Sequence, residues 1–158
     1  MTTLVVASSQ HGSTREIAER IAEVLRVNKG VTTVVEDTKD APKWLATVDA
    51  VVVALPVYGG SLDKAGKAFL DTHRAELAGT SLFIAVSGGS PELAPRLREV
   101  VASYGARDVA YLRGAVTEEK LGFLDKLTIK LAKGQFGDFR NWDAIEDWGK
   151  SLASHGAH

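Results

Sequence analysis

The stretch that decides the fold is VVASSQHGSTREIAERI, residues Val5–Ile21. It continues the apolar run that starts at Leu4, which is typical of a strand buried on both faces. Seven small or polar residues, Ser8–Thr14, interrupt this run, and apolar residues then recur at helical spacing from Ile17 onward. We therefore expect the chain to leave a strand, pass through a hydroxyl-rich loop with one glycine, and enter a helix.

The loop between this strand and this helix predicts a phosphate site. The first N–H groups of a helix have no partner within the helix and lie at the positive end of its dipole, so they bind anions well. We expect the backbone to provide most of the hydrogen bonds, while the hydroxyls of Ser9 and Thr14 add direct ones. The full predicted set is Ser9, Gln10, His11, Gly12, Ser13 and Thr14. The competing interpretation is an ordinary turn in which Ser13 or Thr14 only caps the helix.

Length and composition bound the class of protein. The 158 residues suffice for one domain with a substantial core, and 45% apolar with 25% charged residues is typical of a globular chain. The absence of cysteine excludes disulfides, thiolate metal ligands and a cysteine nucleophile. No secretory signal is present, nor an apolar run of the ~20 residues that a spanning helix needs, so we expect a cytoplasmic protein. A net charge of −1 argues against a general nucleic-acid binder.

Strand patterns and helical patterns alternate along the remaining chain. Further strands are predicted at Val31–Glu36, Asp49–Leu55, Ser81–Ser87 and Asp108–Val116. Helices are predicted at residues 13–27, 62–77, 92–104 and 142–154. This regular alternation predicts βαβ units and a parallel sheet, and therefore a single α/β domain covering residues 1–158.

Two more glycine-rich loops follow predicted strands, at Pro56–Ser61 and at Ser87–Pro91. Loops without bulky side chains let a flat ligand approach the backbone closely. Together with the phosphate loop they would line one crevice at the carboxyl edge of the sheet. The residues predicted to contact a ligand there are Pro56, Val57, Tyr58, Gly59, Gly60, Ser87, Gly88 and Gly89. Tyr58 is interpreted either as an aromatic that stacks on the ligand or as an ordinary exposed turn residue.

Other nucleotide-binding arrangements lack the residues that they need. The first loop has no Walker lysine and the chain has no Gly-x-Gly-x-x-Gly, so neither a nucleotide-hydrolysing P-loop nor a dinucleotide site is expected. A receiver domain would need acidic residues after the first strand, where this chain has Ser8-Ser9, and an aspartate at the end of the third strand, where it has Leu55-Pro56. A receiver domain is therefore not expected. No catalytic residue and no metal site are predicted, and structural or solvent-facing roles are assigned to His73, Asp143, Glu146 and Asp147.

The first loop resembles the phosphate loop of the flavodoxin superfamily. The residues that match are Val5, Val6, Ser9, Gly12, Thr14 and Ala18. Ala7 departs from the pattern, which usually has an aromatic at this packing position. The resemblance implies a flavodoxin-like three-layer α/β sandwich, with a five-stranded parallel sheet of order 2-1-3-4-5. It also implies FMN as the cofactor, with Tyr58 stacked on the isoalloxazine ring and the Ser87–Gly89 backbone at the polar edge of that ring.

Short identities in the later part of the chain resemble the menaquinone-dependent protoporphyrinogen oxidases of the same superfamily. These are Tyr58-Gly59, the spacing of Phe69, His73 and Leu77, Gly114-Ala115, and Asp125-Lys126 with Ile129-Lys130-Leu131. The resemblance implies a porphyrinogen substrate, protoporphyrinogen IX, and electron transfer to a quinone. Val57 departs from it, because those oxidases carry an arginine there. Two alternatives stay open: a flavodoxin-type electron-transfer protein without its own organic substrate, and a flavodoxin-like domain that has lost the flavin.

Residues Thr117–Arg140 form a longer connection than such folds usually contain. An extra helical segment is expected there, at Glu118–Lys133. From Arg113 to Arg140, six basic residues stand against four acidic ones. This pattern is compatible with contact to an anionic membrane surface or an acidic redox partner, and also with a helix packed over the edge of the sheet.

Overall fold

The centre of the molecule is a parallel sheet whose strands follow the order β2-β1-β3-β5-β6. The computed structural model describes residues 2–8, 12–29, 31–90, 92–113, 115–116, 137–138 and 142–155. The parallel strands are β1 (Thr2–Ala7), β2 (Thr32–Asp37), β3 (Ala50–Tyr58), β5 (Ser81–Gly88) and β6 (Asp108–Arg113). A short strand, β4 (Ser61–Leu62), pairs antiparallel with β3. The predicted order is therefore confirmed, because β4 is a hairpin extension that adds no parallel strand.

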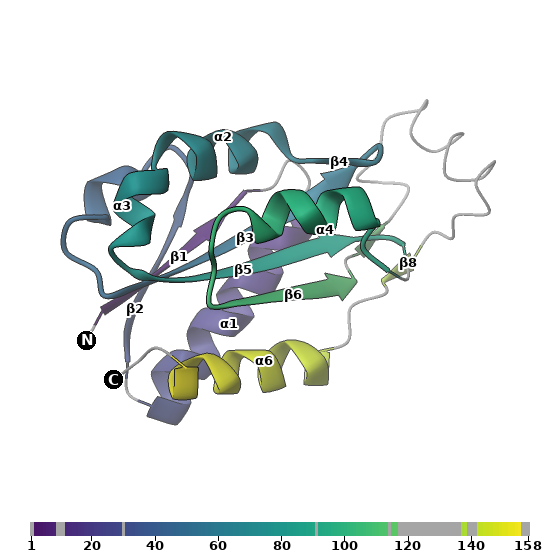
Figure 1. Ribbon diagram of the computed structural model, residues 1–158. Coiled ribbons are helices and arrows are strands. Elements are labelled where there is room, and N and C mark those ends of the chain that lie inside the picture. The colour runs from purple at the N-terminus through teal and green to yellow at the C-terminus, as the bar shows by residue number, and fades with distance from the viewer. Residues whose placement is uncertain are drawn as a thin grey trace.

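Helices cover both faces of this sheet and give the molecule three layers (Figure 1). One face carries α1 (Ser13–Lys29) and α6 (Trp142–His155). The other face carries α2 (Lys64–Thr72), α3 (Arg74–Ala78) and α4 (Pro95–Ala102), with the short 3-10 helix η1 (Ala41–Trp44) packed in the same core. The predicted three-layer sandwich is confirmed.

Alternation along the central strands divides the core into two halves. Successive side chains of a strand point to opposite faces of the sheet. Val5 and Val52 accordingly pack with Ile21 and Ile145 beneath α1 and α6. Their neighbours Val6 and Val53 point to the opposite face and belong to the other half of the core. The helix residues of that half are Phe69 and Leu70 of α2, Leu77 of α3, and Leu97 and Val101 of α4. Burial on both faces explains why these strands read as continuous apolar runs.

Of the element boundaries that differ from the sequence-based expectation, three change how the chain is organised. β3 continues through Pro56 to Tyr58, because β1 already ends opposite Ala54 and the missing N–H of proline removes no bond from that ladder. The expected helix at 62–77 is divided at His73, which has non-helical backbone angles and ends α2 while capping α3. The helix expected from residue 92 begins at Pro95, since a residue that precedes proline favours an extended backbone.

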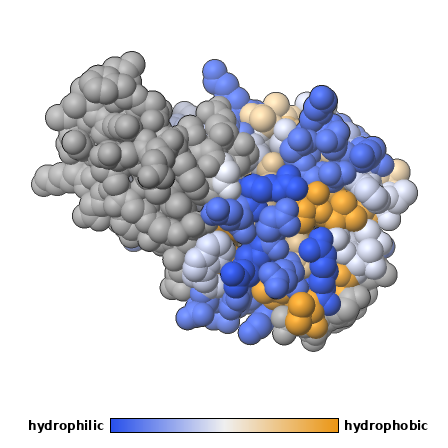
Figure 2. All heavy atoms as spheres, turned by 180° about the vertical axis from the view of Figure 1, so that it is seen from behind, coloured by the Kyte–Doolittle hydropathy of each residue, from blue (hydrophilic) through white to orange (hydrophobic). Residues whose placement is uncertain are grey.

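The region after β6 also differs from the expectation. The strand predicted at Asp108–Val116 ends at Arg113, and a separate strand, β7 (Ala115–Val116), pairs antiparallel with β8 (Gly137–Asp138). The helical segment expected at Glu118–Lys133 lies outside the described residues. Seen from behind, hydrophilic residues cover most of the described surface and hydrophobic ones gather in small separate areas (Figure 2). No helix among the described residues is both long and apolar enough to cross a bilayer.

A polar cluster on the outer surface joins α2 and α3 to the end of α4. The Tyr104 hydroxyl donates a hydrogen bond to Asp71 Oδ1 at 2.7 Å, and the Arg74 guanidinium lies 4.5 Å from the centroid of the Tyr104 ring. Partial burial, together with the hydrogen bond to the Asp71 carboxylate, raises the pKa of Tyr104 to about 12. The cluster lies away from the carboxyl edge of the sheet, so we assign it to stability.

Replacing Tyr104 with phenylalanine is expected to lower the free energy of unfolding by about 1 kcal/mol near neutral pH, because one hydrogen bond to a half-exposed carboxylate is lost. A tyrosine whose pKa is higher in the folded state stabilises fully below its ordinary value of 10.0 and loses this effect as the pH rises toward 12. The difference between wild type and Tyr104→Phe should therefore shrink over that interval. Urea unfolding across the alkaline range measures it, and a difference independent of pH would contradict the assignment.

Candidate functional site

Three loops meet at the carboxyl edge of the sheet. The first loop (residues 8–14) follows β1, the second (residues 56–61) spans the end of β3, and the third (residues 87–90) follows β5. The register places Ala7 beside Ala54, and Pro56 beside Ser87. Because β1, β3 and β5 are neighbours and parallel, the described residues of these loops are brought to one edge, on the side of the sheet where β4 lies in Figure 1.

The first loop turns directly into α1. Gly12 has a φ of +86°, a conformation that other residues rarely adopt, and its carbonyl accepts a hydrogen bond from Glu16 N at 3.1 Å. Thr14 is fully buried in the first turn of the helix. The predicted ligands Ser9, Gln10 and His11 lie outside the described residues, and Ser13 is described only as the first residue of α1.

A hydrogen bond between two hydroxyls joins the first loop to the third. Thr14 Oγ1 and Ser87 Oγ lie 3.0 Å apart, and both side chains are buried. A hydroxyl can accept one hydrogen bond while it donates another. Ser87 can thus donate to Thr14 while the Thr14 hydroxyl donates to an anion held by the first loop. The Thr14–Ser87 contact is therefore compatible with the predicted hydrogen bond from Thr14 to a phosphate.

The second loop is a tight hairpin. Val57 and Tyr58 pair with Leu62 and Ser61, and the two glycines between them have φ values of +55° and +79°. Positive φ at both central positions is typical of a type I′ turn, for which Gly-Gly between two strand residues is a recognised signal. That signal predicts the hairpin, which the interpretation of 56–61 as a glycine-rich loop missed.

The tip of this hairpin leaves space next to its backbone. A Cβ built on Gly59 or Gly60 meets no atom within 4 Å. Arg96 of α4 donates a hydrogen bond from Nη2 to the Gly60 carbonyl at 2.6 Å, which ties the tip to the neighbouring helix. Val57 and Tyr58 are half-buried, and the Tyr58 hydroxyl oxygen is shielded from solvent. The arrangement leaves the stacking role of Tyr58 a prediction.

The third loop is held by a side chain from the next strand. Tyr111 of β6 donates a hydrogen bond from its hydroxyl to the Ser90 carbonyl at 2.6 Å. A Cβ built on Gly88 would lie 2.8 Å from that hydroxyl, so a side chain at Gly88 would displace Tyr111. Gly89 is exposed. The glycines therefore serve two purposes: Gly88 makes room for the tyrosine, and Gly89 leaves the exposed part of the third loop without a side chain.

The sequence-based prediction missed a buried pair that joins the first loop to the segment after β4. The Ser8 hydroxyl donates a hydrogen bond to Asp63 Oδ2, and the two residues are 3% and 4% exposed. Asp63 caps α2 by accepting a hydrogen bond from Gly66 N at 3.1 Å. An aspartate just before a helical segment is a recognisable capping signal, but nothing in the local pattern indicates its second partner.

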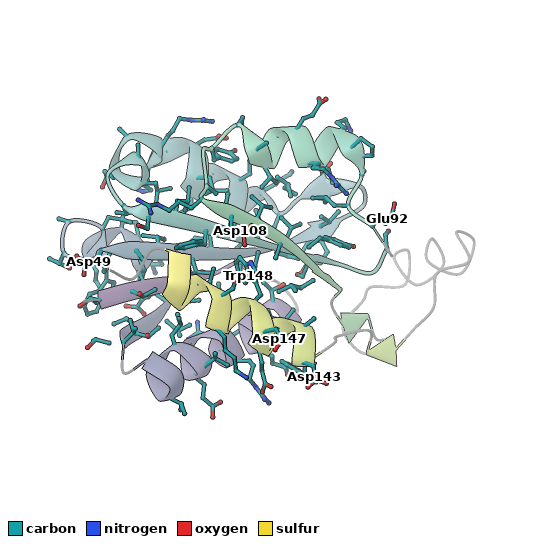
Figure 3. All side chains as sticks on the ribbon, turned by 60° about the horizontal axis from the view of Figure 1, so that its bottom comes forward. Asp49, Glu92, Asp108, Asp143, Asp147 and Trp148 are labelled. Atoms are coloured by element: carbon teal, nitrogen blue, oxygen red, sulfur yellow. The ribbon has the colours of Figure 1, made fainter. Side chains whose placement is uncertain are left out.

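The side chains that were assigned structural roles lie elsewhere. His73 contacts Glu76 at 2.8 Å and packs against the Phe69 ring. Figure 3 shows Asp143 and Asp147 on α6, where both are exposed, and Trp148 directed at Asp108 of β6, with Nε1 to Oδ2 at 2.9 Å. Within the described part of the chain, no group of three or more His, Asp or Glu side chains could hold a metal ion. Two open depressions of about 240 and 410 Å³ lie along α1 and α6, and none of the residues that line them belongs to the three loops.

Comparison with solved structures finds flavodoxins. The Streptococcus pneumoniae TIGR4 flavodoxin is 26% identical, with a TM-score of 0.55 over 84% of this chain and 99% of that one. Flavodoxin 1 from Bacillus cereus is 18% identical, with a TM-score of 0.61 over 98% of this chain and 99% of that one. The Fusobacterium nucleatum flavodoxin bound to flavin mononucleotide is 15% identical, with a TM-score of 0.61 over 98% of each chain. At identities below 25%, the last two show the fold alone.

Sequence comparison assigns the family. Comparison with curated protein sequences gave no match. The family model described as a flavodoxin domain matches residues 4–140, which include all three loops and every strand of the parallel sheet beyond the first two residues of β1. The chain therefore belongs to the flavodoxin domain family.

Proposed function

We propose that this chain binds FMN between the three loops and works as a flavodoxin-type electron-transfer protein. The observation that carries the proposal is the convergence of these loops at one edge of the sheet in a member of the flavodoxin domain family. A similar structure, the Fusobacterium nucleatum flavodoxin, is bound to flavin mononucleotide. A bound flavin would supply the electron-accepting and electron-donating chemistry, while the protein supplies binding, orientation and electrostatics.

The residues present fit this cofactor. The first loop leads into the N-terminus of a 17-residue helix, where backbone N–H groups and the helix dipole favour a phosphate. The Thr14–Ser87 hydroxyl pair offers a buried donor to that phosphate. The open space beside Gly59 and Gly60 lets a flat ring approach the hairpin backbone. Phosphate binding is assigned to residues 9–14, and ring binding to residues 56–60 and 87–89.

Titration of the apoprotein with FMN tests the proposal. We expect quenching of FMN fluorescence with one FMN bound per chain, and we expect the chromophore released from purified protein to have the mass of FMN. Reduced protein should then pass electrons to a one-electron acceptor such as a cytochrome. A chain that folds but leaves FMN fluorescence unchanged would contradict the proposal and favour a domain that has lost the flavin.

A second candidate function is oxidation of protoporphyrinogen IX with electron transfer to a quinone. It rests on the sequence resemblance, whose most specific part, Asp125–Leu131, lies outside the described residues. Phe69 and Leu77, which also carry that resemblance, are buried core residues, so packing accounts for them. Anaerobic incubation of the flavin-loaded protein with protoporphyrinogen and a quinone separates the two candidates, since only an oxidase would produce protoporphyrin.

Membrane contact through residues 117–140 also stays a prediction. Of this range, only Gly137 and Asp138 lie in the described part of the chain. Sedimentation with vesicles of anionic or neutral lipid is the direct measurement. Binding that requires anionic lipid would support a basic membrane-facing segment, whereas equal sedimentation with both would remove the membrane interpretation and leave the acidic redox partner and the packed helix.

A further inference from the structure

The buried carboxylate of Asp63 connects two of the three loops. Asp63 follows β4 directly, and its backbone N–H donates to the Pro56 carbonyl at 2.9 Å, which anchors it to the second loop. Its Oδ2 atom accepts hydrogen bonds from the Ser8 hydroxyl and from Gly66 N. Ser8 is the first residue of the first loop, 55 positions earlier in the chain. One carboxylate oxygen therefore joins the start of the phosphate loop to the base of the hairpin.

A capping role alone does not account for this arrangement. The capping requirement of α2 is met by the hydrogen bond from Gly66 N, and serine or asparagine would provide an equivalent acceptor. None of the described ion pairs involves Asp63, so this carboxylate, at 4% exposure, is stabilised by hydrogen bonds and by the N-terminus of α2 rather than by a cation. A shorter capping side chain such as serine would lack the hydrogen bond that Asp63 accepts from the Ser8 hydroxyl.

Ser8 is held from both sides. Its backbone N–H donates to the Ala54 carbonyl at 2.9 Å, and its hydroxyl donates to Asp63. These two bonds fix the position and direction in which the chain leaves β1 and enters the loop. Because the hydroxyl proton is directed at the carboxylate, Ser8 is not a donor to a ligand in the first loop.

We propose that Asp63 is a positioning residue for phosphate binding, which acts by holding Ser8 and thereby fixing the start of the first loop. This inference rests on the proposed binding of FMN. Asp63 itself does not touch the phosphate. Its effect should therefore appear in the discrimination between FMN and riboflavin, which has the same ring system but no phosphate.

Four variants separate positioning from capping. Ser8→Ala removes the hydroxyl, and Asp63→Ser keeps a helix cap but is too short to reach Ser8 as well. Asp63→Asn keeps an oxygen that can accept from both Ser8 and Gly66, so it serves as the conservative variant. Ser81→Ala, at a buried serine at the amino end of β5, is the matched control.

We expect Ser8→Ala and Asp63→Ser each to lower the ratio of riboflavin Kd to FMN Kd about tenfold, the equivalent of one hydrogen bond. Asp63→Asn and Ser81→Ala should keep the ratio within about twofold, and the double variant Ser8→Ala/Asp63→Ser should be no worse than either single one. If Asp63→Ser does not fold, the ratio of riboflavin Kd to FMN Kd in Ser8→Ala, compared with that in Ser81→Ala, decides the question.

Equally weaker binding of FMN and riboflavin, or additive effects in the double variant, would overturn the inference. A wild type that binds riboflavin as tightly as FMN would overturn it too, and a wild type that binds neither would overturn the proposed function itself.

Discussion

Replacing Thr14 with valine is expected to weaken FMN binding about 10- to 100-fold, because a hydrogen bond to a charged phosphate contributes about 1.5–3 kcal/mol. Valine has nearly the same shape and fits the buried position, so the helix should persist. Riboflavin affinity should change much less, since riboflavin carries no phosphate. Fluorescence titrations of the apoprotein with both ligands provide the measurement.

Two features make this experiment decisive. The Ser87 hydroxyl loses its buried partner in Thr14→Val, so the apoprotein itself should be less stable, and the ratio of the two affinities is therefore more informative than either alone. Thr33→Val is a matched control, because Thr33 is a buried threonine of β2 whose hydroxyl donates only to the Val31 carbonyl. An unchanged ratio in Thr14→Val would mean that Thr14 only joins the first loop to the third.

Replacing Gly66 with alanine is expected to lower the free energy of unfolding by up to about 2 kcal/mol, because overpacking a well-packed core costs about 1–3 kcal/mol and the better helix propensity of alanine offsets about 1 kcal/mol of it. A Cβ built at this position lies 2.8 Å from Leu55 Cβ and 3.1 Å from Ser8 Cβ. Both neighbours belong to the fixed edge of the sheet rather than to the end of a flexible side chain. The helix must therefore move away from β3, and this cost exceeds the ~1 kcal/mol by which alanine favours a helix over glycine.

Gly79→Ala provides the matched substitution for this stability measurement. Gly79 ends α3 with a φ of −84°, and a Cβ built there lies no closer than 3.5 Å to another atom. We expect its effect on urea unfolding to stay within about 0.5 kcal/mol. Similar losses for both variants would show that close approach of α2 to β3 is not the reason for glycine at position 66. If the alanine side chain in Gly66→Ala displaces Ser8, we also expect this variant to discriminate less well between FMN and riboflavin.

The arrangement of the parallel sheet could be predicted because its causes are local. The strands from Leu4 to Ala7 and from Asp49 to Leu55 are continuous apolar runs, and burial on both faces requires that pattern. The helical spacing after Thr14 reflects the face that α1 buries against the sheet. With βαβ connections of one handedness, few strand orders remain, and the resemblance of the first loop selected the one that is observed.

Two of the boundaries that were predicted wrongly, at Pro56 and at His73, depend on neighbours distant in sequence. Pro56 reads as a strand breaker, yet it continues β3 because β1 has already ended on that side. His73 falls inside an apolar periodicity that suggests one helix, but the chain bends there so that Leu77 of α3 enters the core. The residues around Pro56 and His73 do not contain this information, since the first boundary depends on where β1 ends and the second on where Leu77 packs.

The sequence by itself determined the family, the strand order and the three loops at the carboxyl edge of the sheet, because glycines, small residues and apolar runs impose these features over short distances. Only the tertiary structure decided how the loops are held relative to one another. The Ser8–Asp63 and Thr14–Ser87 contacts join residues 55 and 73 positions apart. Such pairs become visible only after the sheet has set its register, because hydrogen bonds between side chains depend on distances in space that no spacing along the chain encodes.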